Sequence, residues 1–168
     1  MRAGVRSAAT IGVLCFILVL GALWGWKAVT APFPKKVAAP LCEDQKISKG
    51  DKVYPSEIIV SVYNAGTRNG LAGTTMQFFT DQGFQEGDVG DAPGKSKVPV
   101  VQIWTTDPHN PAVRLVESRF GPAHKVVKKK GPGSGITVVV GDGFTKLRKG
   151  PHFVVARADA VICSPPLG

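Results

Sequence analysis

The sequence has 168 residues, of which 43% are hydrophobic and 20% are charged, a composition that excludes wholesale disorder. Beyond its apolar N-terminal segment there is room for one domain of ordinary size, and not for two. The formal net charge of +9 draws the chain toward polyanions, which include nucleic acid, acidic lipid headgroups and phosphate-bearing cell-wall polymers.

An uncharged segment occupies residues 10–26 and reads TIGVLCFILVLGALWGW. Extended through residue 29, it reaches about the 20 residues with which a helix crosses a bilayer, and Trp24 and Trp26 suit the membrane interface. A cleaved signal peptide is the alternative, but signal cores usually have only about 7–15 apolar residues. The sequence therefore predicts a transmembrane helix at residues 10–29, after a cytoplasmic N-terminus of residues 1–9.

The charges that flank the span leave its orientation nearly undecided. The cysteines help to decide on which side of the membrane the domain lies. Cys15 lies within the span, so Cys42 and Cys163 remain, near the two ends of the exported part. A bridge between them would close a loop of about 120 residues and would persist only in an oxidising compartment. Two unrelated thiols are the alternative. With the bridge, the N-terminus is cytoplasmic and the remainder is extracytoplasmic, in a single-pass protein of the cell membrane.

Residues 30–55 contain four prolines and scattered lysines with little periodicity, a pattern typical of an extended extracytoplasmic linker. The folded domain is therefore expected to cover residues 56–150. Residues 151–168 then form a C-terminal extension, which a disulfide would tie back to the linker. The 20 glycines and 13 prolines of the chain indicate short elements joined by many turns.

The first half of the domain begins with a strand and a helix. Residues 58–64, IIVSVYN, are rich in β-branched side chains and predict the strand. Apolar residues at helical spacing predict the helix at residues 71–82, with Asn69 as its N-cap and Gly83 at its end.

Two further strands and a second helix follow. Residues 84–89 and 98–105 predict the strands, and Pro99 favours a sheet edge for the second of them. Asn110 and Pro111 predict the start of the helix, since asparagine caps free amides and proline lacks the donor that would be unpaired there.

Residues 124–128 and 136–140 predict two more strands, after a helix that stops at Gly121, and residues 146–156 suggest a further short one. The element order β-α-β-β-α-β-β is a split βαβ arrangement with one added strand. The predicted fold class is α+β, a small split βαβ-like sandwich with its helices on one face of the sheet, after the N-terminal transmembrane helix.

Basic residues gather between residues 121 and 150, where Asp142 is the single acidic residue. The candidate anion-binding residues are Lys125, Lys128, Lys129, Lys130, Lys146, Arg148 and Lys149. The glycine-rich loop at residues 131–135 would bring these lysines together on one mobile surface. Lysines on an exposed strand edge also discourage aggregation, so that a contact with a polyanion and protection of an edge both stay open.

Residue patterns for catalysis or metal binding are lacking in the sequence. The histidines His109, His124 and His152 are scattered, and no HExxH, CxxC or GxSxG spacing occurs. We therefore expect no metal, no cofactor and no catalytic residue, although a triad assembled in space leaves no local mark. The turn at residues 66–70 lacks the Lys-Ser/Thr ending of a phosphate loop, so it is interpreted as a tight turn rather than an anion site.

A family resemblance is carried by the run VSVYNAG, starting at Val60, and by RNGLA at residues 68–72. These segments resemble the opening motif of the LytR C-terminal (LytR_C) domain, a strand that ends in Asn and is followed by Gly-Leu-Ala. The motif residues are Asn64, Gly66, Gly70, Leu71 and Ala72. A membrane span, one such domain and flanking cysteines also resemble the actinobacterial envelope integrity proteins of the Cei type.

The resemblance implies an extracytoplasmic role in maintaining the cell envelope rather than a reaction, since the phosphotransferase domain of longer relatives is not found in this sequence. We expect a non-enzymatic module that binds envelope glycopolymer, lipid or an envelope-assembly protein, and no nucleic acid because of the compartment. Two alternatives stay open. One is a small-molecule or lipid carrier with Phe78, Phe79 and Trp104 around an apolar pocket, and the other is an envelope hydrolase or transferase.

Overall fold

The computed structural model describes residues 12–22, 26, 42–94 and 97–166. The chain divides into two compact units, Met1–Ala38 and Ala39–Gly168. In the first unit residues 12–22 are helical, and among the described residues no helix is both long and apolar enough to span a membrane. The N-terminus predicted to be cytoplasmic, residues 1–9, lies outside the described residues, as do residues 10–11, 23–25 and 27–29 of the predicted span, so both stay predictions.

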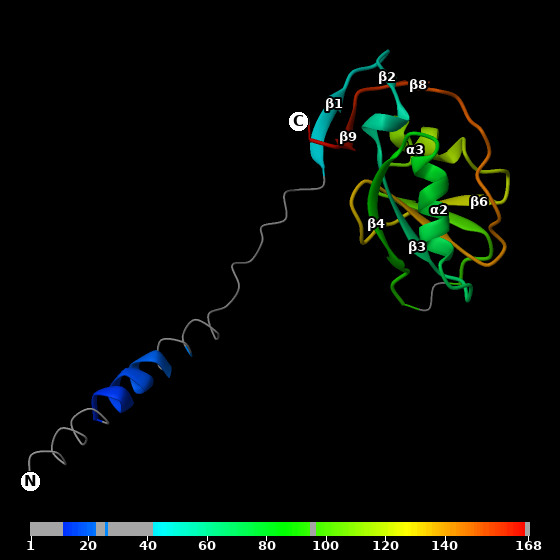
Figure 1. Ribbon diagram of the computed structural model, residues 1–168. Coiled ribbons are helices and arrows are strands. Elements are labelled where there is room, and N and C mark those ends of the chain that lie inside the picture. Colours follow the sequence, from blue (N-terminus) through cyan, green and yellow to red (C-terminus); the bar gives the residue numbers. More distant parts are fainter. Residues whose placement is uncertain (1–11, 23–25, 27–41, 95–96, 167–168) are drawn as a thin grey trace, which may run out of the picture. The chain divides into compact units, whose positions relative to one another are not determined.

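A five-stranded sheet forms the centre of the second unit, with the strand order β4-β3-β7-β5-β6 (Figure 1). Its strands are β3 (Ile59–Asn64), β4 (Gln85–Asp91), β5 (Val101–Thr105), β6 (His124–Lys128) and β7 (Ile136–Val140). Only β5 and β7 pair antiparallel, while the other neighbouring strands pair in parallel. The predicted α+β class is confirmed, and the elements from β3 to β7 follow the predicted order.

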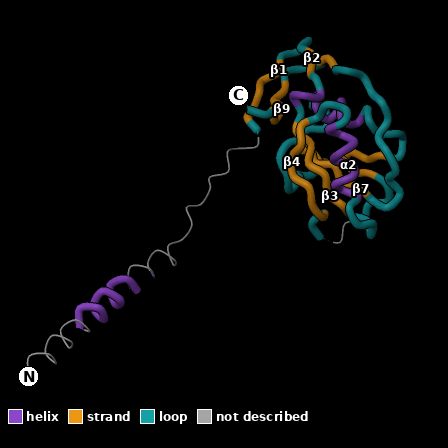
Figure 2. The backbone as a smooth tube through the Cα atoms, in the orientation of Figure 1, coloured by secondary structure: helices purple, strands orange, loops and turns teal. Residues whose placement is uncertain are grey.

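Both helices of this unit, α2 (Leu71–Thr80) and α3 (Pro111–Glu117), pack on the same face of the sheet. Figure 2 shows α2 lying across the strands β3 and β4. Phe79 of α2 is fully buried there, with edge contacts to the rings of Phe84 and Phe120. Burial of such apolar side chains contributes about 1.5–3 kcal/mol each, so this face holds the main core.

Side chains alternate between the two faces of each strand, which gives the sheet a second, smaller apolar cluster on its other face. This cluster contains Val98, Trp104 and Val139, with Tyr63 and Val127 packed against it. No helix covers this face among the described residues, and the loop between β6 and β7 lies over part of it. The two faces of the sheet are therefore covered by different kinds of structure.

The segment predicted as a linker is folded where the structure describes it. The strand β1 (Glu43–Ile47) pairs with β9 (Ala160–Ser164), and β2 (Lys52–Val53) pairs with β8 (Val154–Val155), while Pro55–Glu57 forms the short 3-10 helix η1. Ile47 and Val53 are buried in the main core. The linker prediction is thus wrong for residues 42–55, because the strands that pair with this segment lie more than 100 residues away and leave no local pattern.

Smaller differences concern the ends of elements. The N-cap of α2 is Gly70, in the left-handed conformation with φ 73°, so the prediction of Asn69 is wrong. Strand β5 starts at Val101 and lies between β7 and β6, so Pro99 precedes an interior strand instead of marking an edge. The start of α3 is as predicted, with the Ala112 amide donating to the Asn110 side chain.

Candidate functional site

The family-motif residues build the connection from β3 to α2. Asn64 closes the turn on both sides, because its side chain accepts from the Gly66 amide and donates to the Arg68 carbonyl, both at 2.9 Å. Gly70 supplies the positive φ with which α2 begins, and Leu71 and Ala72 are buried in the core. The motif is therefore structural in this chain.

The free amides of this turn are satisfied from within the chain by Asp142. Its carboxylate accepts from the amides of Thr67 at 2.8 Å and Arg68 at 3.1 Å, and from the Thr67 hydroxyl at 3.1 Å. The Arg68 guanidinium donates to the carbonyl of Phe144 at 2.8 Å, just beyond Asp142. A Cβ at Gly66 would collide with the Asp142 carboxylate, so this glycine permits the close approach. The predicted turn is present, and the amides of Thr67 and Arg68 are satisfied from within the chain.

We expect the stability that Asp142 contributes to depend on pH. The amide of Thr67, together with the Arg68 amide and the Thr67 hydroxyl, holds the pKa of Asp142 below its usual value despite partial desolvation. A carboxyl with a lowered folded-state pKa stabilises the fold above its unfolded pKa of about 3.9 and loses this effect as the pH falls through the folded pKa. Asp142→Asn should therefore lower the Tm at pH 7, and the difference from wild type should shrink below about pH 4. Equal differences at both pH values would contradict this account.

The basic residues predicted to form one surface are distributed over separate places. Lys130 lines a groove at the end of β5, and the ammonium of Lys129 lies 3.8 Å from the centre of the Trp104 ring. At the other end of the β5–β6 pair, Lys146 and Arg148 line a small cavity of about 190 Å³ beside His124.

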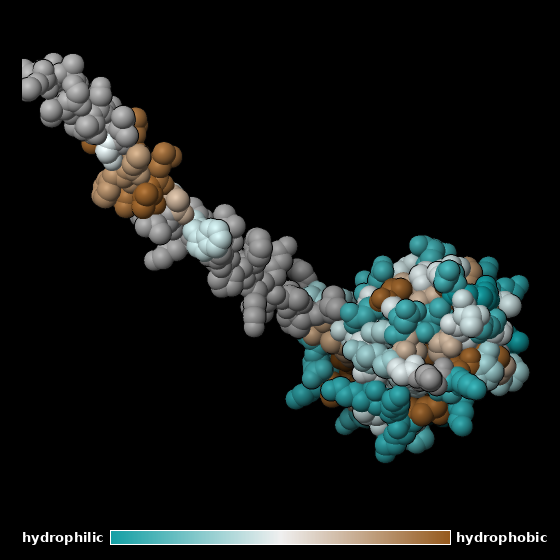
Figure 3. Space-filling view, turned by 90° about the horizontal axis from the view of Figure 1, so that it is seen from below, coloured by the Kyte–Doolittle hydropathy of each residue, from teal (hydrophilic) through white to brown (hydrophobic). Residues whose placement is uncertain are grey.

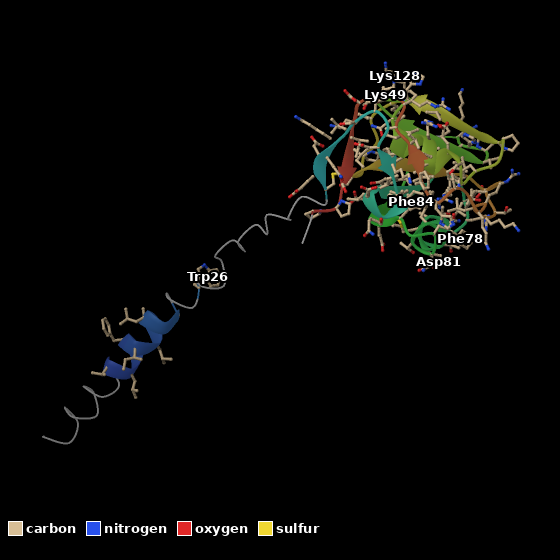
Figure 4. The ribbon with its side chains drawn as sticks, turned by 90° about the horizontal axis from the view of Figure 1, so that it is seen from above. Trp26, Lys49, Phe78, Asp81, Phe84 and Lys128 are labelled. Atoms are coloured by element: carbon tan, nitrogen blue, oxygen red, sulfur yellow. A yellow bond between two sulfur atoms is a disulfide. The ribbon has the colours of Figure 1, made fainter. Side chains whose placement is uncertain are left out.

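Lys149 lies in a third place, where it lines a cavity together with Asp81. Figure 4 shows Lys128 on the opposite side of the domain from Asp81, so the predicted lysine patch is divided. Lys125 and Lys128 are exposed on β6, an edge strand of the sheet, where they suit protection of that edge.

The glycine-rich loop that was expected to be mobile is packed against the sheet. A Cβ at Gly131 would collide with Thr137, and one at Gly135 would collide with the carbonyl of Ile59. The Ser61 hydroxyl donates to the Ser134 carbonyl at 2.7 Å. The glycines thus allow a close approach of two backbones, and they position Lys130 at the end of β5.

A groove with a volume of about 610 Å³ lies where this loop faces the β1–β9 ribbon. Its polar lining comes from separate segments, namely Asp44, Thr105, Thr106, Asp107, Asn110 and Lys130. Its apolar lining includes Ile58, Trp104, Ala112, Ile136, Val161 and Ile162. The groove therefore combines hydrogen-bonding groups with apolar surface, an arrangement suited to a polar ligand.

A disulfide and a side-chain hydrogen bond hold the outer wall of the groove in place. Cys42 and Cys163 are bonded, with their Cα atoms 5.2 Å apart, which confirms the predicted bridge. The Asn110 side chain donates to the Val161 carbonyl at 2.8 Å and so connects the start of α3 to β9. The β1–β9 ribbon is therefore fixed at the bridge and at the groove.

The three histidines lie in separate places in the described part of the chain. His124 lies 3.5 Å from Glu117, His109 is exposed, and His152 lines the cavity near Asp81. No group of three metal-ligating side chains occurs among the residues with described positions. The aromatic side chains proposed for an apolar pocket do not share one, since Phe79 lies in the main core and Trp104 on the other face of the sheet.

Most of the groove and one buried arginine were not predicted from the sequence. Asp44 was assigned to a linker, and Asn110 was identified only as a helix cap. Arg119 is 4% exposed, although arginine is a typical surface residue. It follows Val116 by three positions, on the stripe of α3 that was predicted to be buried, and this spacing was the available signal.

The family model LytR_C, described as LytR cell envelope-related transcriptional attenuator, matches residues 57–144. A solved structure, the soluble domain of a conserved hypothetical secreted protein from Mycobacterium marinum, is similar with a TM-score of 0.50 and 20% sequence identity. The similarity covers 67% of this chain and 79% of that chain, and it shows a shared fold. No curated protein is significantly similar to the chain. Because the family model matches more than half of the residues, from η1 to the turn after β7, this chain belongs to the LytR_C family.

Proposed function

We propose that the chain is a membrane-tethered, non-enzymatic module of the cell envelope, and that its domain lies outside the cytoplasm and binds an envelope glycopolymer in the groove. The disulfide between Cys42 and Cys163 supports an oxidising compartment. Membership of a cell envelope-related family supports a location in the cell envelope. The similarity to a domain of a secreted protein agrees with export. The apolar N-terminal segment is the proposed tether.

The proposed ligand is inferred from the residues that line the groove. A sugar chain presents hydroxyl groups along its edges and apolar C–H faces, and the groove offers both kinds of contact. Asp107 offers a hydrogen-bond acceptor and Lys130 a donor, while Val161 and Ile162 supply apolar surface. Figure 3 shows a mostly hydrophilic domain surface with small separate apolar patches on the face in view, which does not favour a lipid surface as the ligand.

The test of this function compares two neighbouring lysines. Lys130 lines the groove and Lys128 does not, and both are exposed. Binding of purified envelope glycopolymer to the full-length protein in non-ionic detergent is measured by calorimetry at fixed ionic strength. Lys130→Ala should weaken binding about tenfold, because it removes a charge-assisted hydrogen bond, whereas Lys128→Ala should change it less than about twofold.

A second variant fills the groove without changing its charge. Thr106 is exposed and lines the groove, so Thr106→Trp should obstruct the ligand and leave the core intact. If Lys128→Ala and Lys130→Ala weaken binding equally and Thr106→Trp has no effect, the ligand is held by diffuse charge and the groove proposal is wrong. Weak binding that disappears with added salt in every variant would lead to the same conclusion.

A further inference from the structure

A second cavity, of about 400 Å³, lies where the C-terminal ends of α2 and α3 meet the segment before β8. It is lined by Pro55, Asp81, Gln82, Arg119, Lys149, Gly150, Pro151 and His152. The groove borders the N-terminal end of α3 at Asn110, so the two sites lie at opposite ends of this helix. The cavity is large enough for a small organic ligand.

Arg119 places a buried positive charge in the wall of this cavity. The residue is 4% exposed, and burial lowers the pKa of its guanidinium. One of its terminal nitrogens donates to the Pro151 carbonyl at 2.8 Å, but its Nε has no hydrogen-bond partner. No carboxylate of the described residues forms an ion pair with it. Burying a charge without a counter-charge is energetically costly. An anion bound in this cavity would therefore stabilise the guanidinium of Arg119.

The guanidinium lies between an aromatic ring and the backbone at Gly150. Its central carbon lies 5.2 Å from the centre of the Phe84 ring, and the backbone carbonyl of Arg119 accepts from the Arg148 amide at 2.8 Å. A Cβ at Gly150 would lie 2.6 Å from Nη1, so the chain passes directly over the guanidinium because this residue is glycine. A donor fixed in this way loses little conformational freedom when a ligand binds.

Other groups around the cavity divide into donors and acceptors. Lys149 is exposed and forms no ion pair within the described part, so its ammonium is a second available cation. The Gln82 Oε1 is buried without a hydrogen-bond partner. Asp81 accepts from the Gln77 side chain at 2.9 Å and keeps further acceptor capacity. The cavity thus combines two cationic donors with two acceptors.

We propose that this cavity binds a phosphate ester whose neighbouring carbons carry hydroxyl groups, such as a phosphorylated polyol or sugar. Arg119 supplies a charge-assisted hydrogen bond to the phosphate, and Lys149 balances the second negative charge. Gln82 and Asp81 accept from the hydroxyl groups, which a bare anion does not have. The proposal for this cavity is independent of the proposed function of the groove. It still holds if no glycopolymer binds in the groove.

The experiment measures binding of sn-glycerol 3-phosphate to the full-length protein in non-ionic detergent, by calorimetry at constant ionic strength. We expect saturable binding to one site. Lys149→Gln should weaken it about tenfold, since it removes one charge-assisted hydrogen bond to the phosphate. The matched control is Lys49→Gln, which removes the same charge at an exposed lysine on the opposite side of the domain from Asp81 (Figure 4), and should change binding less than about twofold.

Two further variants test the buried groups. Arg119→Met should abolish binding, and its circular dichroism spectrum shows whether the fold is kept. Gln82→Leu should reduce the preference for glycerol 3-phosphate over inorganic phosphate, because only the ester offers hydroxyl groups, and it leaves the charges unchanged. This second variant keeps the test decisive even where Arg119→Met does not fold.

The source of the phosphate is separated by adding phosphatidylglycerol to the detergent micelles. Competition with glycerol 3-phosphate identifies a lipid headgroup as the ligand, and absence of competition identifies a soluble or polymer-borne ester. Either outcome supports the proposal. It is overturned if glycerol 3-phosphate does not bind, if Lys149→Gln and Lys49→Gln weaken binding equally, or if acetate competes as well as phosphate.

Discussion

Replacing both Cys42 and Cys163 by serine is expected to lower the free energy of unfolding by about 4–5 kcal/mol. The bridge joins residues 121 positions apart, and it restricts the unfolded chain strongly because the closed loop is long. For a domain of this size the loss corresponds to a decrease in Tm of roughly 10–20 °C. Calorimetry of the oxidised wild type and of the double variant measures it.

Reduction of the wild type gives the same comparison without a substitution. In excess reductant its Tm should fall to that of the double serine variant, which should itself be insensitive to reductant. Cys15→Ser is the matched control, because Cys15 is a free cysteine and its removal should leave the effect of the reductant unchanged. A wild-type Tm that is equal with and without reductant would contradict the stabilising role of the bridge.

Loss of the bridge should also weaken ligand binding in the groove at temperatures where the domain stays folded. The β1–β9 ribbon forms one wall of the groove, and without the disulfide it is held at that end only by backbone pairing and the bond from Asn110 to Val161. The cavity at Arg119 has no wall from this ribbon, so binding of glycerol 3-phosphate should be unaffected.

The second large effect is expected for Gly135→Ala, which should destabilise the domain by about 3 kcal/mol or more. Gly135 has φ 67°, a conformation that costs other residues roughly 1–2 kcal/mol. Its new Cβ would also collide with the carbonyl of Ile59, in the central strand β3. The backbone of the sheet cannot yield easily, so the loop would have to move away, and Lys130 would leave the groove with it.

Gly70→Ala separates the two causes of this effect. Gly70 has φ 73°, close to that of Gly135, but a Cβ there would have no neighbour within 4 Å. It should therefore show only the backbone cost of roughly 1–2 kcal/mol. Urea unfolding of both variants measures the difference, and equal losses would mean that the loop is not closely packed on the sheet.

Local patterns predicted those elements whose own residues determine them. The strand at residues 58–64 and the capped start of α3 at Asn110 were visible because β-branched runs and caps act within a few residues. The cysteine pair was predicted by exclusion, since Cys15 lies in the apolar segment. The pairing of residues 43–53 with the C-terminal segment was not predicted, because the sequence of a short strand does not indicate which strand it pairs with.

Patterns in the sequence predicted the α+β class, the order of elements from β3 to β7 and the disulfide, and they indicated the family. Three features became visible only in the folded chain: Asp142 satisfies the turn after β3, the basic residues lie apart, and Arg119 is buried with no ion pair to any described carboxylate. The physical reason is distance along the chain. The periodicity of a segment indicates which of its side chains are exposed and which are buried. The groove and the cavity depend instead on contacts between distant segments, such as that of Asn110 with Val161, which no local pattern predicts.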